Sequence, residues 1–486
     1  MTHDTTTPRL SPRLTPHLLL IVADGVRPDV LAEEITAGHT PALAELAARG
    51  GQHTVTSSFP SVTGPAYVPF LMGRHPASVG LPGLRWYDRA RTLSWAFTPT
   101  RSYAGIDIWH VDRDLAPDAP TLLELAQPSL SGMCMLSRGA THGRIGRSTA
   151  WMIRGAPVHF RGDLRGWQRV EQMATSAFFD RFSAVQPRAS VLAITSADKY
   201  AHKFGPHSDE VRSSIADIDR AVSMAHAIAD RDHWQNPLHV WVVGDHGHEA
   251  ITQHEDLHGW FVARGFRVLA HPQLTVRNPD VALMVGGNAM AHLYLEPASR
   301  TRHWWPHYAT RWESMVDALV ARESIDLAAV ALDSTTVRVT QAGRGTAHIT
   351  MTGEDHEARF SYRPITGDPL GLGGSHTALD RSDAWMVTRQ SPYPDALMQL
   401  LLLVTAPRSG DIVLSASTGW DLRARYEPVS HVSTHGALLR EQMQVPLLLD
   451  IPTQREPQRT ADVVPSALDL LGIESAALWD GQSFLR

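Results

Sequence analysis

Short runs of apolar residues alternate with amphipathic segments through the first half of the chain. The apolar runs occupy residues 18–23, 191–194 and 238–243, and each is too short to cross a membrane. Residues 208–232 carry apolar side chains at helical spacing, at Val211, Ile215, Ile218, Val222 and Ala225. Because strands that alternate with helices pair in parallel, the pattern from residue 18 to about residue 266 predicts an α/β fold, with a mostly parallel central sheet flanked by helices.

The second half of the chain predicts a further lobe. Residues 281–296 have a strand pattern, residues 311–330 contain a helical pattern, and residues 335–362 alternate apolar and polar side chains as hairpin strands do. We therefore expect a small inserted α+β lobe at about 297–370, placed as a cap that shapes a pocket. The apolar runs at 411–415 and 445–450 are expected to return to the main sheet.

Composition indicates one large domain. The 486 residues are 43% hydrophobic and 19% charged, which is enough to bury an extensive core. Residues 1–16 are rich in Thr and Pro and are expected to form a flexible tail, so the domain would span residues 17–486.

Two features favour a reducing compartment. The tail lacks the apolar segment of a secretory signal. The single cysteine, Cys134, excludes an intrachain disulfide. We expect a buried thiol and a cytoplasmic protein, either a monomer or a homodimer.

Charge and hydropathy exclude two classes of partner. The net charge is −6, and Lys and Arg form no cluster or stripe of the kind that binds nucleic acid or a membrane surface. The sequence also contains no stretch that approaches the ~18 consecutive apolar residues expected of a transmembrane helix. We expect neither a nucleic acid nor a membrane as a partner.

Acidic residues follow three of the predicted strands. Asp24 follows the first, Asp198 the second, with His202 four residues later, and Asp245-His246 the third. A further histidine, His435, precedes the apolar run at 445–450. Open α/β sheets present their chemistry at the carboxyl ends of their strands. Each residue alone also fits a purely structural role. Asp24 could form a turn, and any one of the 26 histidines could be a surface or core residue.

Taken together, these three aspartates and three histidines predict a metal site. Imidazole and carboxylate ligands suit Zn²⁺, and Mn²⁺ or Fe would also accept them. Six ligands suffice for two ions. Metal pairs at about 3.5–4 Å clamp both the attacking and the leaving oxygen of a phosphoryl transfer.

A hydroxyl group for such a transfer is available at Thr63. Gly64 and Pro65 follow it and precede an apolar stretch, which predicts a helix start where a phosphate would meet free N–H groups. Metal coordination would make this hydroxyl a nucleophile. Thr63 also fits an N-cap role, and the hydroxyls of Ser57, Ser58 and Ser61 offer the same chemistry.

Six segments together resemble the alkaline phosphatase superfamily, and most closely its nucleotide pyrophosphatase/phosphodiesterase branch. They are residues 18–25, residues 57–80, Asp198-x3-His202 with Phe204-Gly205-Pro206, Asp245-His246-Gly247, Thr434-His435-Gly436, and residues 459–472. The resemblance implies an alkaline phosphatase-like catalytic domain. It also implies a metal-dependent hydrolase of phosphoric ester or phosphoanhydride bonds, whose substrate is a small-molecule phosphate ester.

The resemblance also assigns roles. One ion would be held by Asp198, His202 and His435, and the other by Asp24, Asp245, His246 and Thr63. The family's nucleophilic threonine precedes a Gly by ten residues and a Pro by thirteen, a spacing that Gly73 and Pro76 give to Thr63 and not to Ser58. The implied reaction is a two-step displacement through a phosphothreonine, as in a phosphodiesterase or nucleotide pyrophosphatase.

Two departures from the branch leave the substrate open. Thr63 is followed by Gly64-Pro65-Ala66 where the branch has Phe-Pro-Asn, and Gly83-Leu84-Arg85-Trp86-Tyr87 stands where a phosphate-binding Asn is usual. Arg85 offers a guanidinium to a phosphate instead, which keeps a phosphomonoesterase of a small metabolite as the alternative, and it also fits a surface role. The signature of sulfatases is missing at the nucleophile segment, so a sulfate ester is not expected as the substrate.

Several other side chains are candidate pocket residues. Tyr67, Trp86 and Tyr87 are suited to stack a flat group of the substrate, and equally to pack in the core. His254, His258 and His376 are weaker candidates, which also fit exposed or hydrogen-bonded roles. A non-catalytic scaffold is the competing class of protein, but none of the six metal ligands is missing.

Overall fold

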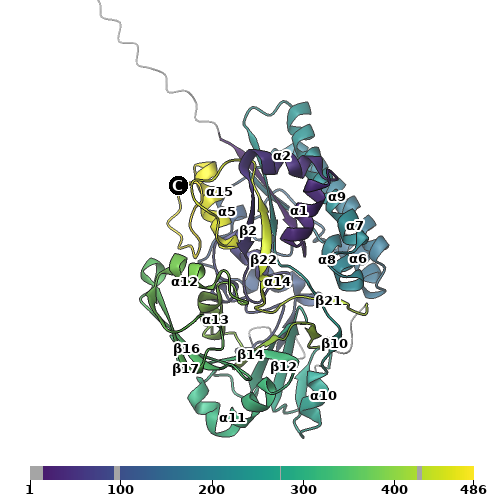
Figure 1. Ribbon diagram of the computed structural model, residues 1–486. Helices are drawn as coiled ribbons and strands as arrows, with labels where there is room; N and C mark the ends of the chain where they lie inside the picture. Colours follow the sequence, from purple (N-terminus) through teal and green to yellow (C-terminus); the bar gives the residue numbers. More distant parts are fainter. Residues whose placement is uncertain (1–14, 92–98, 274, 424–428) are drawn as a thin grey trace, which may run out of the picture.

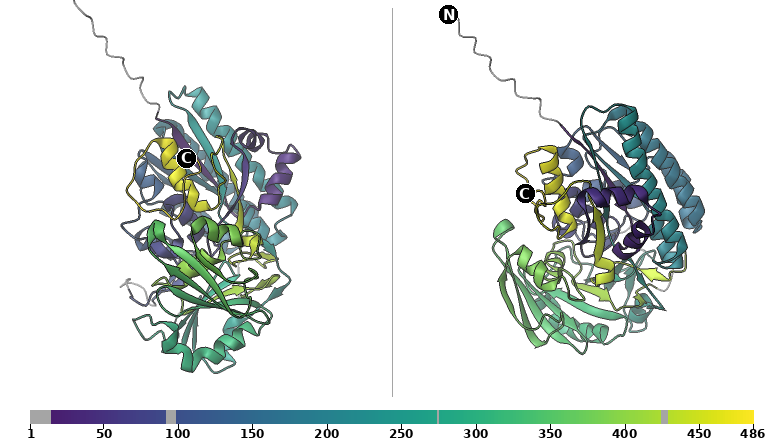
Figure 2. Two further views of the ribbon diagram at one scale, coloured as in Figure 1. Left: turned by 60° about the vertical axis from the view of Figure 1, so that its left-hand side comes forward. Right: turned by 45° about the horizontal axis from the view of Figure 1, so that its top comes forward.

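The fold comprises two lobes, each built on its own β-sheet (Figures 1 and 2). The computed structural model describes residues 15–91, 99–273, 275–423 and 429–486. The predicted tail at 1–16 therefore lies outside the described residues, except for its last two. Among the described residues, no helix is long and apolar enough to cross a membrane.

The first sheet has seven strands in the order β2-β22-β8-β1-β7-β5-β6. Its strands are β1 (His17–Ala23), β2 (Gln52–Thr56), β5 (Ser129–Gly132), β6 (Arg144–Ile145), β7 (Ala189–Ile194), β8 (Leu238–Gly244) and β22 (Gln444–Leu448). The five strands from β8 to β6 pair in parallel, whereas β22 pairs antiparallel with β8 on one side and with β2 on the other. The predicted α/β class with a mostly parallel central sheet is thus confirmed, as is the return of the run at 445–450 to this sheet.

The register of the central strand positions the site. Ala23, the last residue of β1, is opposite Ile194 of β7 on one side and Gly244 of β8 on the other. The three strands therefore end at the same level. The segments that follow them, which carry Asp24, Asp198 and Asp245, leave the sheet at one edge.

Both faces of the first sheet are covered by helices. Alternate residues of β1 enter two different cores, Leu19 and Ile21 on one face and Leu18 and Leu20 on the other. The first face packs against α1 (Pro28–Thr36), α2 (Pro41–Gly50), α7 (Leu164–Val185) and α9 (Asp209–Arg231), and the second against α3 (Val68–Met72), α5 (Leu122–Leu125) and α15 (Val463–Leu471). The helix predicted at 208–232 is α9.

The second sheet has nine strands in the order β11-β12-β13-β19-β14-β15-β16-β17-β18, and every pair except β11–β12 is antiparallel. Its strands are β11 (Val268–Ala270), β12 (Val281–Gly286), β13 (Met290–Leu295), β14 (Ile325–Ala331), β15 (Thr336–Gln341), β16 (Gly345–Thr352), β17 (Arg359–Gly367), β18 (His376–Leu379) and β19 (Ile412–Ala416). Helices α11 (Trp305–Val320) and α13 (Ala396–Val404) pack on it.

The sequence interval 297–370, predicted as an inserted lobe, contains α11 and β14 to β17. The sheet that these strands join extends further in both directions, from β11 to β19. The run at 411–415 was predicted in the main sheet, and that prediction is wrong, because β19 pairs with β13 and β14. A short apolar strand is buried on both faces in either sheet, so its composition does not identify its partners.

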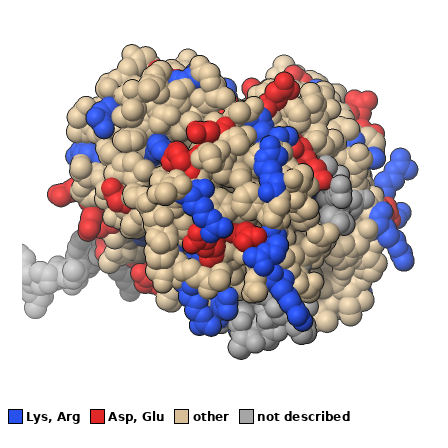
Figure 3. Space-filling model, turned by 90° about the horizontal axis from the view of Figure 1, so that it is seen from below, with Lys and Arg blue, Asp and Glu red and all other residues tan. Residues whose placement is uncertain are grey.

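Hydrogen bonds join the lobes next to the edge where β1, β7 and β8 end, for example at Gln399 and at His435. On α13, the Gln399 side chain accepts a hydrogen bond from the backbone N–H of Phe59, at 2.8 Å. The turn between β12 and β13 pairs with a loop of the first lobe, where Asn288 and His435 form a parallel bridge and the N–H of Ala289 donates to the His435 carbonyl at 3.0 Å. On the face seen from below, Lys and Arg side chains alternate with Asp and Glu, without a stripe of one sign (Figure 3).

Candidate metal centre and active site

The first group of candidate ligands consists of Asp24, Asp245 and His246. Asp24 follows β1, and Asp245 and His246 follow the neighbouring β8. All three side chains are buried, and one ligand atom of each lies within 4.8 Å of the others. His246 Nε2 is 3.3 Å from Asp245 Oδ2 and 3.6 Å from Asp24 Oδ1. The parallel register of β1 and β8 thus produces the predicted cluster.

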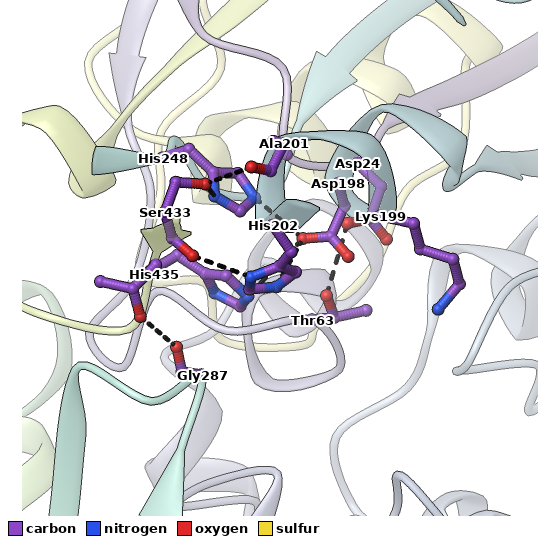
Figure 4. Close-up of polar contacts among 12 residues, drawn as sticks. Asp24, Thr63, Asp198, Lys199, Ala201, His202, His248, Gly287, Ser433 and His435 are labelled. Carbon is purple, nitrogen blue, oxygen red and sulfur yellow. Dashed lines mark hydrogen bonds and ion pairs between the residues drawn. The ribbon is translucent and has the colours of Figure 1, made fainter. Parts of the chain in front are cut away.

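The second group is organised by α8 (Ser196–Phe204), which follows β7. Asp198 lies in the first turn of this helix and His202 one turn later on the same face, with His202 Nε2 at 3.4 Å from Asp198 Oδ1. His435 Nε2 approaches the same oxygen, at 3.6 Å (Figure 4). The other ring nitrogens of His202 and His435, both Nδ1, lie 3.0 and 2.9 Å from the carbonyls of Ser433 and Ser61, which orients the rings.

A third histidine belongs to this group, and the sequence analysis missed it. His248 Nε2 lies 2.9 Å from Asp198 Oδ1, and its Nδ1 lies 3.1 Å from Ser433 Oγ (Figure 4). A ligand atom of each of Asp198, His246, His248 and His435 lies within 4.8 Å of the others. The signal was present in the sequence, because His248 follows the Asp245-His246-Gly247 motif directly.

Thr63 lies between the two groups. Its Oγ1 is 3.0 Å from His246 Nε2 and donates to Asp24 Oδ1 at 3.4 Å. Thr63 does not cap a helix in the described structure, because the following 3₁₀ turn, η1 (Pro65–Tyr67), begins after Gly64. The hydroxyl is therefore oriented toward the candidate ligands.

The three competing serine hydroxyls either donate to backbone carbonyls or are buried without a partner among the described residues. Ser57 Oγ donates to the carbonyl of Asp245, and Ser61 Oγ donates to the carbonyl of Ala437 at 2.9 Å. Ser58 is buried, and its Oγ has no hydrogen-bond partner among the described residues. Of the four candidate hydroxyls, Thr63 is the one that contacts side chains of the candidate metal ligands in the described structure.

The buried carboxylates of the cluster favour the binding of cations. Burial, together with the neighbouring carboxylates, raises the pKa of Asp24 well above its usual value, and burial raises the pKa of Asp245 to about 8. Burial alone would also raise the pKa of Asp198, but His202, His248 and His435 lower it. Asp245 Oδ2 is buried and accepts no hydrogen bond from any described residue.

The histidines of the cluster are suited to bind metal as neutral ligands. Burial and the proximity of His435 lower the pKa of His246 well below its usual value, and burial lowers that of His435 to about 4. Neutral imidazoles beside buried carboxylates form the donor set that Zn²⁺ prefers. The orphaned Asp245 oxygen and this donor set therefore fit two divalent cations.

The predicted substrate-binding residues have different environments. Tyr67 is buried, and its hydroxyl donates to Asp24 Oδ2 at 2.7 Å, so it contacts a candidate metal ligand. Trp86 has no exposed surface and donates through Nε1 to Tyr103 Oη at 3.1 Å. Tyr87 is likewise buried and donates to the Pro297 carbonyl at 2.8 Å. These three aromatic side chains make core contacts, and Trp86 and Tyr87 line neither of the pockets at Thr63.

Two pockets meet at Thr63. A pocket of about 250 Å³ opens on the side of His202 and His435. We call it the polar pocket because charged side chains such as Arg85 and Lys199 line it, although apolar atoms form most of its wall. Arg85 also donates to the Val285 carbonyl at 3.2 Å. A larger pocket, of about 540 Å³, opens on the side of Asp24 and has mainly apolar walls.

The three weaker histidine candidates lie elsewhere. His258 lines a small neighbouring cavity together with Arg85. His254 is exposed, and its Nδ1 is 3.9 Å from Asp421 Oδ2. His376, on β18, has its Nε2 at 3.1 Å from the Leu372 carbonyl, so it does not contact the metal-ligand set.

Comparison with known proteins agrees with this geometry. A family model described as type I phosphodiesterase / nucleotide pyrophosphatase matches residues 18–438. No curated protein sequence matches the chain at a significant level.

Solved structures share the fold over almost the whole chain. Phosphonoacetate hydrolase from Sinorhizobium meliloti 1021, in complex with phosphonoacetate, is 16% identical with a TM-score of 0.56, and the match covers 95% of this chain and 97% of that one. Human ectonucleotide pyrophosphatase/phosphodiesterase 5 is 13% identical with a TM-score of 0.57, covering 96% and 97%. Its murine counterpart, an inactive threonine-to-alanine variant in complex with AMP, is 13% identical with a TM-score of 0.56, also covering 96% and 97%. At these identities the likeness concerns the fold.

Proposed function

Because the chain belongs to the type I phosphodiesterase / nucleotide pyrophosphatase family and is thus a hydrolase of phosphoric ester or phosphoanhydride bonds, we propose that it is a phosphodiesterase that acts through a phosphothreonine at Thr63. The observation that carries this proposal is the position of Thr63 Oγ1, 3.0 Å from His246 Nε2 and 3.4 Å from Asp24 Oδ1. A hydroxyl beside buried carboxylates and neutral imidazoles is placed as a nucleophile should be.

The metal-ligand set supports two bound cations, which we propose to be Zn²⁺. Asp198, His202 and His435 would hold one ion, with His248 beside them, and Asp24, Asp245 and His246 would hold the other. When bound, such ions lower the pKa of the threonine hydroxyl and stabilise the charge that develops on the phosphoryl oxygens. Mn²⁺ and Fe suit the same donors and are alternative occupants.

The reaction would proceed in two displacements at phosphorus. In the first, Thr63 Oγ1 loses its proton and bonds to phosphorus, while the leaving oxygen departs with the electron pair of its P–O bond. In the second, a water oxygen bonds to phosphorus and loses a proton, and Thr63 Oγ1 departs and regains one. Two inversions give net retention of configuration at phosphorus.

A diester is favoured over a monoester because two pockets meet at the nucleophile. The polar pocket and the larger pocket adjoin along eight shared lining residues, which include Thr63 and Asp198, so a phosphoryl group placed there has room for a substituent in either pocket. The alternative, a phosphomonoesterase of a small metabolite, is supported by Arg85 in the polar pocket. Its guanidinium could face the additional anionic oxygen of a monoester.

A paired assay tests the proposal. Zinc-loaded protein is offered bis-p-nitrophenyl phosphate, thymidine 5′-p-nitrophenyl phosphate and p-nitrophenyl phosphate, with Thr63→Ala as the test variant. The matched control is Thr36→Ala, which removes an exposed hydroxyl on α1 that donates to the Ala32 carbonyl of the same helix. We expect faster turnover of the diesters and a loss of about 10³-fold or more in kcat for Thr63→Ala alone.

Three results would contradict parts of this proposal. A preference for p-nitrophenyl phosphate would favour the monoesterase. Full activity of Thr63→Ala would exclude the nucleophile. Inversion at phosphorus, measured with a chiral phosphorothioate diester, would exclude the covalent step.

A further inference from the structure

We propose that the larger pocket binds a bulky apolar substituent of the substrate, so that the enzyme acts on phosphate esters of apolar alcohols. This inference rests on the proposed function, because it assigns one side of the same site. The pocket has a volume of about 540 Å³, against about 250 Å³ for the polar pocket. It is continuous with the reaction centre, since Asp24, Thr63 and Tyr67 line one end of it.

The walls away from the reaction centre are apolar. They come from α6 (Thr149–Phe160), from α7 and from the segment after β5, and include Met133, Met135, Trp151, Met152, Phe160 and Trp167. Aromatic rings and thioethers adapt to flat or branched apolar groups, and methionine makes favourable contacts with aromatic rings. Ligand pockets of this size and lining bury most of a compact organic group.

The charged side chains of the pocket either lie near the candidate metal centre or interact with residues of the pocket wall. Asp24 and Asp198 belong to the candidate metal centre. Lys199, next to Asp198, extends away from the histidines (Figure 4), and its Nζ lies 3.2 Å from His159 Nδ1 and 4.3 Å from the centre of the Trp167 ring. Arg147 donates to the carbonyls of Met135 and Ile108, which fixes it in the wall.

The mouth of the pocket is also apolar. Trp109 and Phe160, both lining residues, keep 40% and 67% of their surface exposed. A substituent with polar edges, such as a nucleobase, would lose water on entry and gain few hydrogen-bond partners there. An apolar ring would gain the full benefit of burial.

Helix α6 provides a way to fill the pocket. Gly155 is the one residue of α6 that is buried, it lines the pocket, and a Cβ on it would lie 3.5 Å from Trp167 Cζ3, an ordinary contact. Gly155→Leu therefore places a side chain in the apolar space. Ala150→Leu, which adds the same side chain at an exposed position of the same helix outside the pocket lining, is the matched control.

The test uses diesters that share one leaving group. Methyl, 2-naphthylmethyl and thymidine 5′ p-nitrophenyl phosphates all release p-nitrophenol, so they differ only in the second substituent. We expect the naphthylmethyl ester to have a KM about tenfold or more below that of the methyl ester. Gly155→Leu should bring the ratio of kcat/KM for these two esters close to one, and Ala150→Leu should leave it unchanged. Equal KM values in the wild-type protein, or a lower KM for the thymidine ester, would overturn the proposal.

A binding measurement separates this inference from the proposed function. Zinc-loaded Thr63→Ala protein is titrated with 2-naphthylmethyl phosphonate and with methyl phosphonate, while the fluorescence of the pocket tryptophans is followed. Tighter binding of the naphthyl compound, lost in Gly155→Leu, supports the pocket even if every ester proves inert and the proposed function fails. Equal binding of the two phosphonates excludes the pocket even if the esters are hydrolysed. Ala156→Leu, a second pocket-lining change on α6, replaces Gly155→Leu if that variant does not fold.

Discussion

The phenol of Tyr67 donates a hydrogen bond to Asp24 Oδ2 at 2.7 Å, in the interior of the protein. Asp24 Oδ1, the other oxygen of the same carboxylate, faces Thr63 Oγ1 and His246 Nε2. One oxygen is therefore fixed by a neutral donor while the other remains directed into the candidate metal centre. Tyr67 is in this sense a positioning residue.

Tyr67→Phe should weaken metal binding without unfolding the protein. Removing the hydroxyl frees the Asp24 carboxylate to rotate, and loss of such an outer contact typically lowers metal affinity by about 10–100-fold. Competition with a fluorescent zinc chelator measures this. Tyr393→Phe, whose hydroxyl accepts from Gln341 in the second lobe, is the control. Equal zinc affinity in the two variants would show that Tyr67 has no such role.

His248→Ala should weaken the ion held near Asp198. The ring of His248 contacts Asp198 Oδ1 at 2.9 Å and links it to Ser433, so its loss frees the carboxylate. We expect zinc affinity at this site to fall by about 10-fold or more. Titration calorimetry on metal-stripped protein resolves the change, and His254→Ala, which removes an exposed imidazole, is the control. A His248→Ala protein that binds both ions as tightly as His254→Ala would contradict the assignment.

Asp245→Asn should change how the stability of the metal-free protein depends on pH. The pKa of Asp245 is raised by burial, from 3.8 to about 8. Between those values the folded state binds more protons than the unfolded state, so the free energy of unfolding falls as pH rises from 4 to 8. In the variant this contribution is absent. Thermal melts in EDTA at pH 5 and pH 8 should show a drop that is smaller by about a few degrees for Asp245→Asn. An unchanged drop would mean that Asp245 is ionised in the metal-free protein.

Gly25→Ala should disturb the spacing of the two ligand groups. Gly25 has a φ of +71°, and a Cβ there would lie 2.8 Å from the Cα of Asp198, so Asp198 would have to move away from Asp24. Gly38→Ala is the matched control, because Gly38 has a φ of +77° and a Cβ added there would meet no atom within 4 Å. Both variants carry the cost of a strained backbone, roughly 1–3 kcal/mol. Only Gly25→Ala should also lose zinc, as measured by metal content after gel filtration.

The sequence predicts most of the candidate metal-ligand cluster because the proximity of these residues depends on a local rule. Asp24 and Asp245 each follow an apolar strand, and parallel strands in register bring such positions together. Asp198 and His202 are related by one helical turn, which is also local. His248 was overlooked because its role depends on Asp198, a residue fifty positions earlier that is brought beside it only by the packing of α8.

The sequence is less informative about which partner a side chain finds. Tyr67 and Trp86 were suited by type to stacking on a substrate, but the hydroxyl of Tyr67 bonds to Asp24 and Trp86 is enclosed in the core. β19 was recognisable as a strand, yet nothing in its five residues specified pairing with β13 and β14 rather than with the parallel sheet. Both outcomes depend on tertiary packing, which local patterns do not contain.

The pairing of Asn288 with His435 has a thermodynamic consequence. His435 is a candidate metal ligand in one lobe, and its backbone is bridged to a turn of the other, with Thr434 Oγ1 donating to the Gly287 carbonyl at 3.0 Å. An ion that binds more tightly while these contacts between the lobes are formed stabilises them, and its removal by a chelator takes that stabilisation away. Amide hydrogen exchange at residues 287–289 would then be slower when metal is bound, although none of these residues is a candidate ligand. The exchange rate of this turn would therefore indicate whether the metal site is occupied.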